Sequence, residues 1–431
     1  MDSSSDLQSS YSTHSSSMSS TDSHEDLNWS IPQGSFAAEL QSQPTSFIVS
    51  VLDEMCFNPD LELVQRQLLS NPFNVCKILR YIPGARMKLT IYFQWLDKLT
   101  KNFVWTVVDN IRDYTCQRRR LPNGHLLGFR SLLNLGTLLM ESGWYAEAVI
   151  LLNIAKGQAK GRPLKILQAL KVKVLALALS NRDEAASLTI TEIYTLIGST
   201  KSIPKGLTAE IHYTLAVSYF ETCEFNASYQ QGLMALRLLV DGFCSHEMII
   251  RTFRQLGKSC LAMRKPYHAK LLITQALSWA WNTFGSTSNM HAETLEDYAF
   301  YLLMLNAYEN AVQVTTEAKN IYYNLYGSLG LQPEVAQGNL PFRLFLESQA
   351  FNKLGPIDGY IDFLGNSARK LEITESDDRQ LVAFERIRPM MAVRDICRGM
   401  SNDLPFDVII ETVQPQCSVN DVKNLFFNDL M

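Results

Sequence analysis

The sequence lacks the features that mark several classes of protein. No uninterrupted apolar run approaches the roughly 18 residues that a membrane-spanning helix needs, so we predict that the chain is not an integral membrane protein. The net charge is only −4, so there is no overall basic field and we do not expect nucleic acid as a partner. The serine-rich start of the chain has no basic segment followed by an apolar core, which argues against a secretory signal.

Motifs that carry chemistry are also missing. The eight cysteines are scattered and include no C-x-x-C pair, which is typical of reduced, individually buried thiols in a cytoplasmic protein. The seven histidines do not cluster, and the sequence contains no Gly-rich phosphate loop, no H-E-x-x-H and no G-x-S-x-G. We therefore expect no metal, no cofactor and no catalytic activity.

Four segments differ in texture along the chain. Residues 1–47 are rich in serine and poor in periodic apolar residues, so we predict a disordered tail. Residues 48–122 carry apolar residues at three- and four-residue steps, which predicts an N-terminal helical region. Residues 125–328 keep this helical pattern in repeated units. Residues 329–431 are broken by prolines, and we predict a divergent, partly helical C-terminal region.

A ladder of small residues recurs within the third segment. Each unit opens with a Leu-Gly, Leu-Ala or Tyr-Ala pair, and ladder positions follow twelve and nineteen residues after the first small residue. Successive units begin 40, 40, 41 and 42 residues apart. In the second unit Leu188 and Thr195 break the pattern. The first ladder positions are Gly136, Ala176, Ala216, Gly257 and Ala299, the second are Ala148, Leu188, Ser228, Ala269 and Ala311, and the third are Ala155, Thr195, Ala235, Ala276 and Ala318.

Small residues at these steps let paired helices pack closely. A small side chain on each of two antiparallel helices lets their backbones approach, and the third small residue admits the next pair. We therefore predict an all-α, tetratricopeptide-type helical-repeat solenoid of about five units. The alternative is an ordinary helical bundle. The period exceeds the standard ~34 residues, and Gly285 and Gly327, each between an aromatic residue and a serine, are expected to cap helices.

The long period and the aromatic-Gly-Ser turn resemble the kinesin-light-chain-like tetratricopeptide repeat family. The resemblance covers roughly residues 60–330. It is carried by ESGWYAEA at 141–148, FRQLGKSC at 253–260, NTFGSTSNMHAETLEDYAFYLL at 282–303 and NLYGS at 324–328.

What the resemblance implies is a non-catalytic cytoplasmic adaptor. Such a protein binds cytoplasmic tails or degron peptides of cargo proteins and is linked to kinesin and microtubule-based intracellular transport. The alternative that it implies is a substrate-receptor subunit of a cullin-RING ubiquitin ligase. LPFDVIIETV at 404–413 looks like a cullin-recruiting box, but it lies at the opposite end of the chain from the family's box. Pro341 stands where a sixth unit would pack, so we expect the repeats to end before it.

The resemblance also implies that the first helix of each unit lines a concave peptide-binding groove. Its groove positions lie three and six residues before the first ladder position, and one and four after it. The predicted groove residues are Arg130, Asn134 at the edge of the stripe, Lys173, Glu210, Tyr213, Arg251, Arg254, Lys258, Glu293, Glu296 and Phe300.

Two alternatives concern how this groove is filled. The basic stripe of Arg251, Arg254 and Lys258 would hold acidic groups of a peptide. Alternatively, Arg254 pairs with Glu296 across neighbouring helices as a surface ion pair. The chain's own tail, 401–431, is a further candidate occupant of the groove because it carries Leu425–Phe427.

Overall fold

The computed structural model describes residues 62–82, 85–100, 102–117, 127–240, 245–305, 307–326 and 387–398, together with residues 50 and 52. The predictions for the tail at 1–47 and for most of 329–431, including Pro341, 404–413 and Leu425–Phe427, lie outside these residues. Gly327 also lies outside them.

The described chain is all α-helical, as predicted. An N-terminal group of helices comprises α3 (Glu62–Ser70), α4 (Pro72–Tyr81), α5 (Ala85–Leu99) and α6 (Phe103–Gln117). Five antiparallel pairs follow as units 1 to 5: α7 (Phe129–Glu141) with α8 (Tyr145–Gln158), α9 (Pro163–Leu179) with α10 (Asp183–Ser199), α11 (Lys205–Glu221) with α12 (Phe225–Val240), α13 (His246–Ala262) with α14 (Pro266–Phe284), and α15 (Asn289–Met304) with α16 (Tyr308–Tyr326). The last described helix is α20 (Ile387–Arg398).

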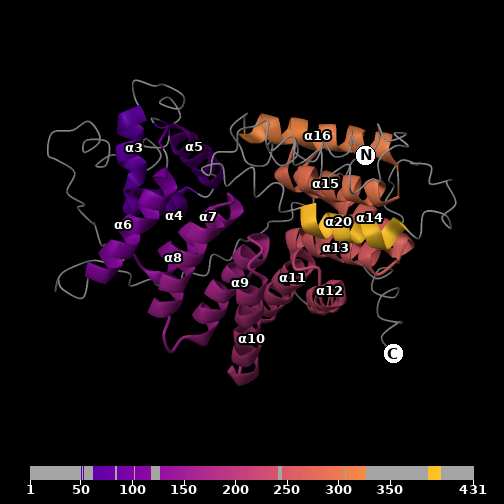
Figure 1. The fold of residues 1–431 in the computed structure, drawn as a ribbon, viewed down its shortest axis with the longest axis horizontal. Coiled ribbons are helices and arrows are strands. Elements are labelled where there is room, and N and C mark those ends of the chain that lie inside the picture. Colours follow the sequence, from indigo (N-terminus) through magenta and orange to yellow (C-terminus); the bar gives the residue numbers. More distant parts are fainter. Residues whose placement is uncertain are drawn as a thin grey trace, which may run out of the picture.

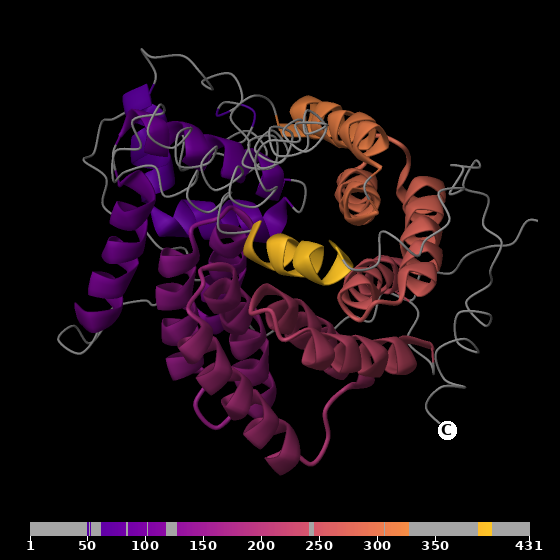
Figure 2. The ribbon, with the colours of Figure 1, turned by 45° about the vertical axis from the view of Figure 1, so that its right-hand side comes forward.

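The five pairs form a curved array (Figure 1). Within each unit the two helices contact each other, and each unit contacts the next one. The array bends far enough that α5, from the N-terminal group, contacts α16 of unit 5. Helix α20 lies inside the curve, where it contacts α11, α13 and α15 (Figure 2). The predicted solenoid is therefore confirmed.

The small ladder residues lie where the helices cross. All three ladder positions of units 1, 3, 4 and 5 are buried. In unit 4 the approach is tight, because a Cβ added to Gly257 would lie 2.5 Å from Ile273 Cγ1. Real Cβ atoms do not approach so closely, so any larger residue at this position would force the Ile273 side chain or the helices α13 and α14 to shift.

Each described turn between the two helices of a unit closes in the same way in units 1 to 4. The residue seven places after the first ladder position has a positive φ, at Gly143, Cys223 and Arg264 in units 1, 3 and 4. The next backbone N–H then donates to a carbonyl five residues back, as from Trp144 to Leu139. This is the Schellman arrangement, which satisfies carbonyls at the end of the first helix.

The same turn shows that the predicted register of unit 2 is wrong by two residues. Its positive-φ residue is Asn181, which places the first ladder position at Val174 rather than Ala176. The later positions then fall on Ala186 and Ile193, and all three are fully buried.

The two residues that seemed to break the ladder point elsewhere. Leu188 is 70% exposed and Thr195 is also exposed. In α9 and α10, each ladder position therefore lies two residues before the one that the Leu175-Ala176 pair predicted. Because Val174 and Ile193 are larger than alanine, unit 2 fills its crossing with aliphatic side chains where unit 4 uses Gly257 and Ala276.

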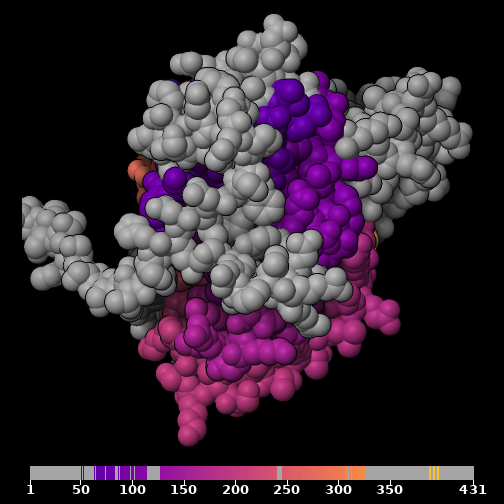
Figure 3. Space-filling model, turned by 90° about the vertical axis from the view of Figure 1, so that its left-hand side faces the viewer, coloured from indigo at the N-terminus to yellow at the C-terminus, as the bar shows by residue number. Residues whose placement is uncertain are grey.

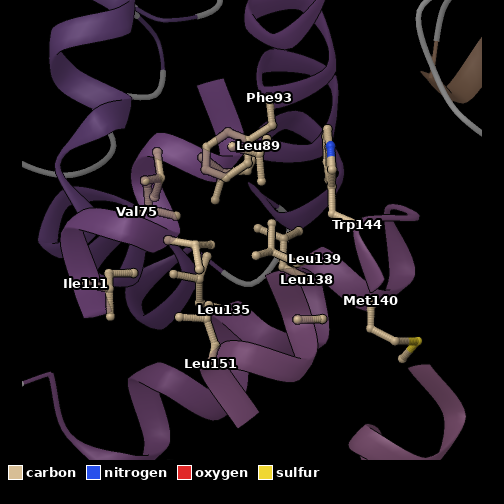
Figure 4. Packing of buried hydrophobic residues seen from close by; sticks show 14 of the residues in the cluster. Val75, Leu89, Phe93, Ile111, Leu135, Leu138, Leu139, Met140, Trp144 and Leu151 are labelled. Carbon is tan, nitrogen blue, oxygen red and sulfur yellow. The ribbon is translucent and has the colours of Figure 1, made fainter. Parts of the chain in front are cut away.

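The N-terminal helices cover the outer face of unit 1. Val75 of α4, Phe93 of α5 and Ile111 of α6 belong to one buried cluster with Leu135 of α7 and Leu151 of α8 (Figure 4). Figure 3 shows these helices beside the first repeat pairs on one face of the molecule. The first unit of a stacked array needs such a cover, because its outer apolar face has no neighbouring unit.

Two turn and thiol predictions also fall within the described chain. Gly285 caps the C-terminus of α14 with φ 88°, as expected for a glycine at a helix end.

The thiols of Cys76, Cys223, Cys260 and Cys397 are free. Burial raises the pKa of the Cys76 thiol to about 12 and that of Cys260 to about 12, so both are held neutral.

Candidate concave binding face

The concave face is formed by the first helices of the units. Helices α11, α13 and α15 all contact α20, which lies inside the curve (Figure 2). These are the helices that carry most of the predicted groove residues. The structure brings together Tyr213, Arg251, Arg254, Lys258, Glu293 and Phe300, and adds Phe220 and Asp297 to them.

Arg254 is held between two carboxylates of the neighbouring unit. Its Nη1 donates to Glu293 Oε2 at 2.6 Å, and its Nε donates to Asp297 Oδ2 at 2.6 Å. Lys258 Nζ lies 3.2 Å from Asp297 Oδ1. The basic stripe is therefore largely neutralised by α15. The expected partner Glu296 is not the one used: Glu296 accepts a hydrogen bond from the Tyr322 hydroxyl at 2.8 Å.

The electrostatics of this charge cluster favour the ionised forms. Burial opposes ionisation of Asp297, but Lys258 and Arg254 more than compensate, so the pKa of Asp297 is below its usual value. Burial likewise opposes ionisation of Glu293, and Arg254 and Arg251 lower its pKa. Burial also disfavours the Arg254 cation, yet Asp297 and Glu293 raise its pKa well above the ordinary value. These charges therefore lock α13 to α15.

A second ion pair occupies the same repeat positions two seams earlier, between units 2 and 3. Lys171 of α9 forms a salt bridge with Glu210 of α11. With the corrected register, Lys171 lies three residues before Val174, which is the groove position that the sequence assigned to Lys173. Lys173 itself is half-buried, and burial followed by the nearby Lys156 charge lowers its pKa.

The remaining predicted residues are less constrained. Arg251 forms an ion pair with Glu247 of its own helix at 2.8 Å, and its side chain is 37% exposed. Arg130 is exposed and Asn134 is half-buried in unit 1, and the structure does not bring either of them to the charge cluster. Arg251 is thus the member of the predicted basic stripe that is least committed to α15.

The aromatic side chains of the groove are covered. Phe300 and Phe220 pack edge to face with ring centroids 6.5 Å apart, and both are buried. They belong to the same buried cluster as Val393 and Cys397 of α20. Cys397 also donates from Sγ to the Leu261 carbonyl at 3.8 Å. The groove residues of units 3 to 5 are therefore occupied by a segment of the same chain.

Sequence reasoning missed Asp297 and the helix that occupies the groove. Asp297 lies one residue away from Glu296, within the groove helix, so the stripe rule passed over it. Helix α20 carries apolar residues at Pro389, Val393, Ile396 and Cys397, a helical spacing that could have been recognised between the prolines. The predicted occupant, 401–431, lies outside the described residues.

Two negative observations complete the site. Within the described residues, no group of three or more His, Cys, Asp and Glu side chains is placed to hold a metal ion. None of the described helices is long and apolar enough to cross a bilayer.

Comparison with known proteins shows a distant sequence similarity over about half of the chain. Amyloid protein-binding protein 2 of Rattus norvegicus is 24% identical over 228 residues, which is 51% of this chain and 38% of that protein. The Mus musculus protein matches to the same extent. The chain is a distant homologue of amyloid protein-binding protein 2. It spans less than half the length of these relatives.

Other comparisons add little to this relationship. No family model matches the chain. Among solved structures, BtubC (BKLC) from P. vanneervenii aligns over 68% of this chain and all of its own, with 12% identity and a TM-score of 0.36. The repeat fold rests on the helix pairs of this chain, which is a tetratricopeptide-like protein distantly related to amyloid protein-binding protein 2.

Proposed function

We propose that the chain is a non-catalytic cytoplasmic adaptor whose concave face binds linear segments of other proteins. The observation that carries this proposal is the occupied groove: α11, α13 and α15 bury Val393 and Cys397 of a segment that is distant in sequence. A surface that buries the apolar face of one such segment and carries charged side chains beside it has contacts of the kind that segment binding needs.

The distant homology adds a class of partner to this proposal. The relative is named for binding amyloid protein, and on this basis we propose that the segments bound here also come from other proteins rather than from nucleic acid or a lipid. The link to kinesin and microtubule-based transport, which the sequence resemblance implied, is part of the same proposal. Recruitment to a cullin-RING ubiquitin ligase is the outcome that would replace it.

The test is proximity labelling in cells with the full chain, compared with two single variants. Arg251→Glu reverses a partly exposed groove cation without removing a partner of Asp297. The matched control is Lys270→Glu, which reverses an exposed cation on α14.

We expect Arg251→Glu to remove a set of labelled proteins that Lys270→Glu retains. Kinesin heavy chain or tubulin in that set supports the transport link, whereas cullin and elongin subunits replace it with the ligase role. Identical labelling by all three chains would show that the concave face does not capture proteins.

A further inference from the structure

Helix α20 is seated in the groove through one face. Val393 and Cys397 are buried, and Ile396 is partly buried against the cluster that contains Phe220, Phe300 and other side chains of units 3 to 5. Pro389 is also buried. These four residues stand at i, i+4, i+7 and i+8, so they share one side of the helix. The groove is therefore complementary to an apolar helix face.

The two ends of α20 are held by polar contacts. At its start, Arg388 Nη2 donates to Asp183 Oδ2 at 2.7 Å and Nη1 donates to Asn181 Oδ1 at 3.3 Å. Near its end, the Cys397 thiol donates to the Leu261 carbonyl of α13. The binding surface of α20 therefore favours one direction of the bound helix. It holds a cation at the start of the helix, at unit 2, and apolar residues towards its end, at units 4 and 5.

The seating of α20 is one that a competitor can reverse. The ion pair at its start is partly exposed, with 36% of the Arg388 side chain and 45% of the Asp183 side chain accessible. The helix has 12 residues, and isolated helices of that length are marginal in water. Its stability therefore depends on the groove, and a longer or better-matched helix would bind the same surface more favourably.

We propose that units 2 to 5 form a helix-binding site, whose partner is an amphipathic α-helix of another protein with small aliphatic residues at i, i+4, i+7 and i+8 and a cation immediately before the first of them. Helix α20 is the internal occupant of this site and competes with the partner. The inference rests on the proposed function and deepens it, because it specifies a helix rather than an extended peptide as the bound segment.

The test uses the full chain and a fluorescently labelled peptide of residues 387–398, followed by fluorescence anisotropy. In the released chain, Val393→Asp and Cys397→Asp place charges on the buried face of α20 and free the groove. We expect this chain to bind the peptide at least tenfold more tightly than the wild-type chain. Equal affinities, or no binding to the released chain, would overturn the proposal.

Two further measurements test whether the peptide binds the surface that α20 occupies in the structure. Asp183→Lys in the released chain should weaken binding several-fold, and an Arg388→Glu peptide should restore it. Glu184→Lys, at the exposed neighbouring position, is the matched control and should change nothing. An effect of both chain substitutions alike, or no rescue by the swapped peptide, would contradict the assigned contact.

The helical form of the ligand is tested by an Ala392→Pro peptide. Proline in the helix interior removes an amide donor and clashes with the carbonyl of Arg388, so affinity should fall about a hundredfold. Unchanged affinity would mean that an extended segment binds, which contradicts the proposal.

Folding of each chain is checked by thermal unfolding. If the doubly substituted chain does not fold, Arg388→Glu in the full chain provides a milder release with the same expected direction. Failure of the peptide to bind while Arg251→Glu still removes labelled partners would refute the helix site and leave the adaptor function standing. Peptide binding to the released chain without any captured protein would support the helix-binding surface and refute the adaptor function.

Discussion

Two seams of the array use the same repeat positions and differ in what their charges do. Between units 2 and 3, Lys171 pairs with Glu210, and the side chains are 22% and 39% exposed. Between units 4 and 5, Arg254 pairs with Glu293 and with Asp297, and the Arg254 and Asp297 side chains are only 13% and 11% exposed. Equivalent positions thus carry a surface pair in one seam and a desolvated cluster in the other.

The difference shows that burial, rather than position in the repeat, decides whether a charge is structural. A partly exposed pair is solvated with or without its partner, so it adds little stability. A desolvated carboxylate such as Asp297 depends on its cations, because water cannot replace them. The residues of units 4 and 5 that were predicted to bind a ligand mainly form ion pairs between α13 and α15.

The largest effect is expected from Arg254→Met. It removes one of the two cations of buried Asp297 and the main cation of half-buried Glu293, which should lower the free energy of unfolding by about 3–5 kcal/mol. Urea unfolding measures it. A loss below 1 kcal/mol would place Arg254 in the same class as Lys171 and end the distinction between the two seams.

The next effect is expected from enlarging a ladder position. Ala276→Leu overpacks the fully buried third position of unit 4 and should cost about 1–3 kcal/mol in thermal or urea unfolding. Thr195→Leu is the control, because the sequence aligned Thr195 with Ala276 but the structure leaves Thr195 exposed. Similar losses for both substitutions would contradict the corrected register of unit 2.

Acid should reduce the difference in free energy of unfolding between the wild-type protein and Arg254→Met. The pKa values of Asp297 and Glu293 lie below their ordinary values of 3.8 and 4.5, so their ionised forms stabilise the fold at neutral pH and this stabilisation is lost as pH falls below about 4. In the variant, one of the charges that lower these two pKa values is missing, so less stability is lost on protonation and acid should reduce the difference. Urea midpoints of both chains at pH 7 and at about pH 3 test this, and a larger difference in acid would refute it.

The smallest effect is expected from Lys171→Met in the seam between units 2 and 3. The pair with Glu210 is partly exposed, so its removal should change the free energy of unfolding by about 0–1 kcal/mol. The measurement is the same urea titration that is used for Arg254→Met. A loss as large as that of Arg254→Met would show that the two seams are equivalent.

The repeat architecture could be predicted from sequence because it depends on local side-chain volume. A close crossing of two helices favours small residues, and Gly257, Ala269 and Ala276 make such a crossing visible in the sequence of unit 4. Unit 2 shows where this reasoning fails. Its crossing is filled by Val174 and Ile193, which resemble ordinary apolar residues, so the nearby Ala176 gave a false register.

The candidate site was less predictable because it depends on contacts between distant segments. A stripe rule can place Arg254 on the concave side, but the choice of Asp297 over Glu296 depends on the rotation of α15 against α13. The seating of α20 depends on a segment that follows unit 5 by many residues, and periodicity within the repeats contains no information about it.

The contact between α5 and α16 joins the N-terminal helices to the last repeat unit, so the array is closed rather than open. An open stack can fray from its last unit or gain another unit without disturbing the rest, because every interface is with a nearest neighbour. Here the two extremities meet, so loosening either one removes an interface from both. The protein should therefore melt as a single cooperative body, and inserting or deleting one unit should disrupt the junction where the circuit closes.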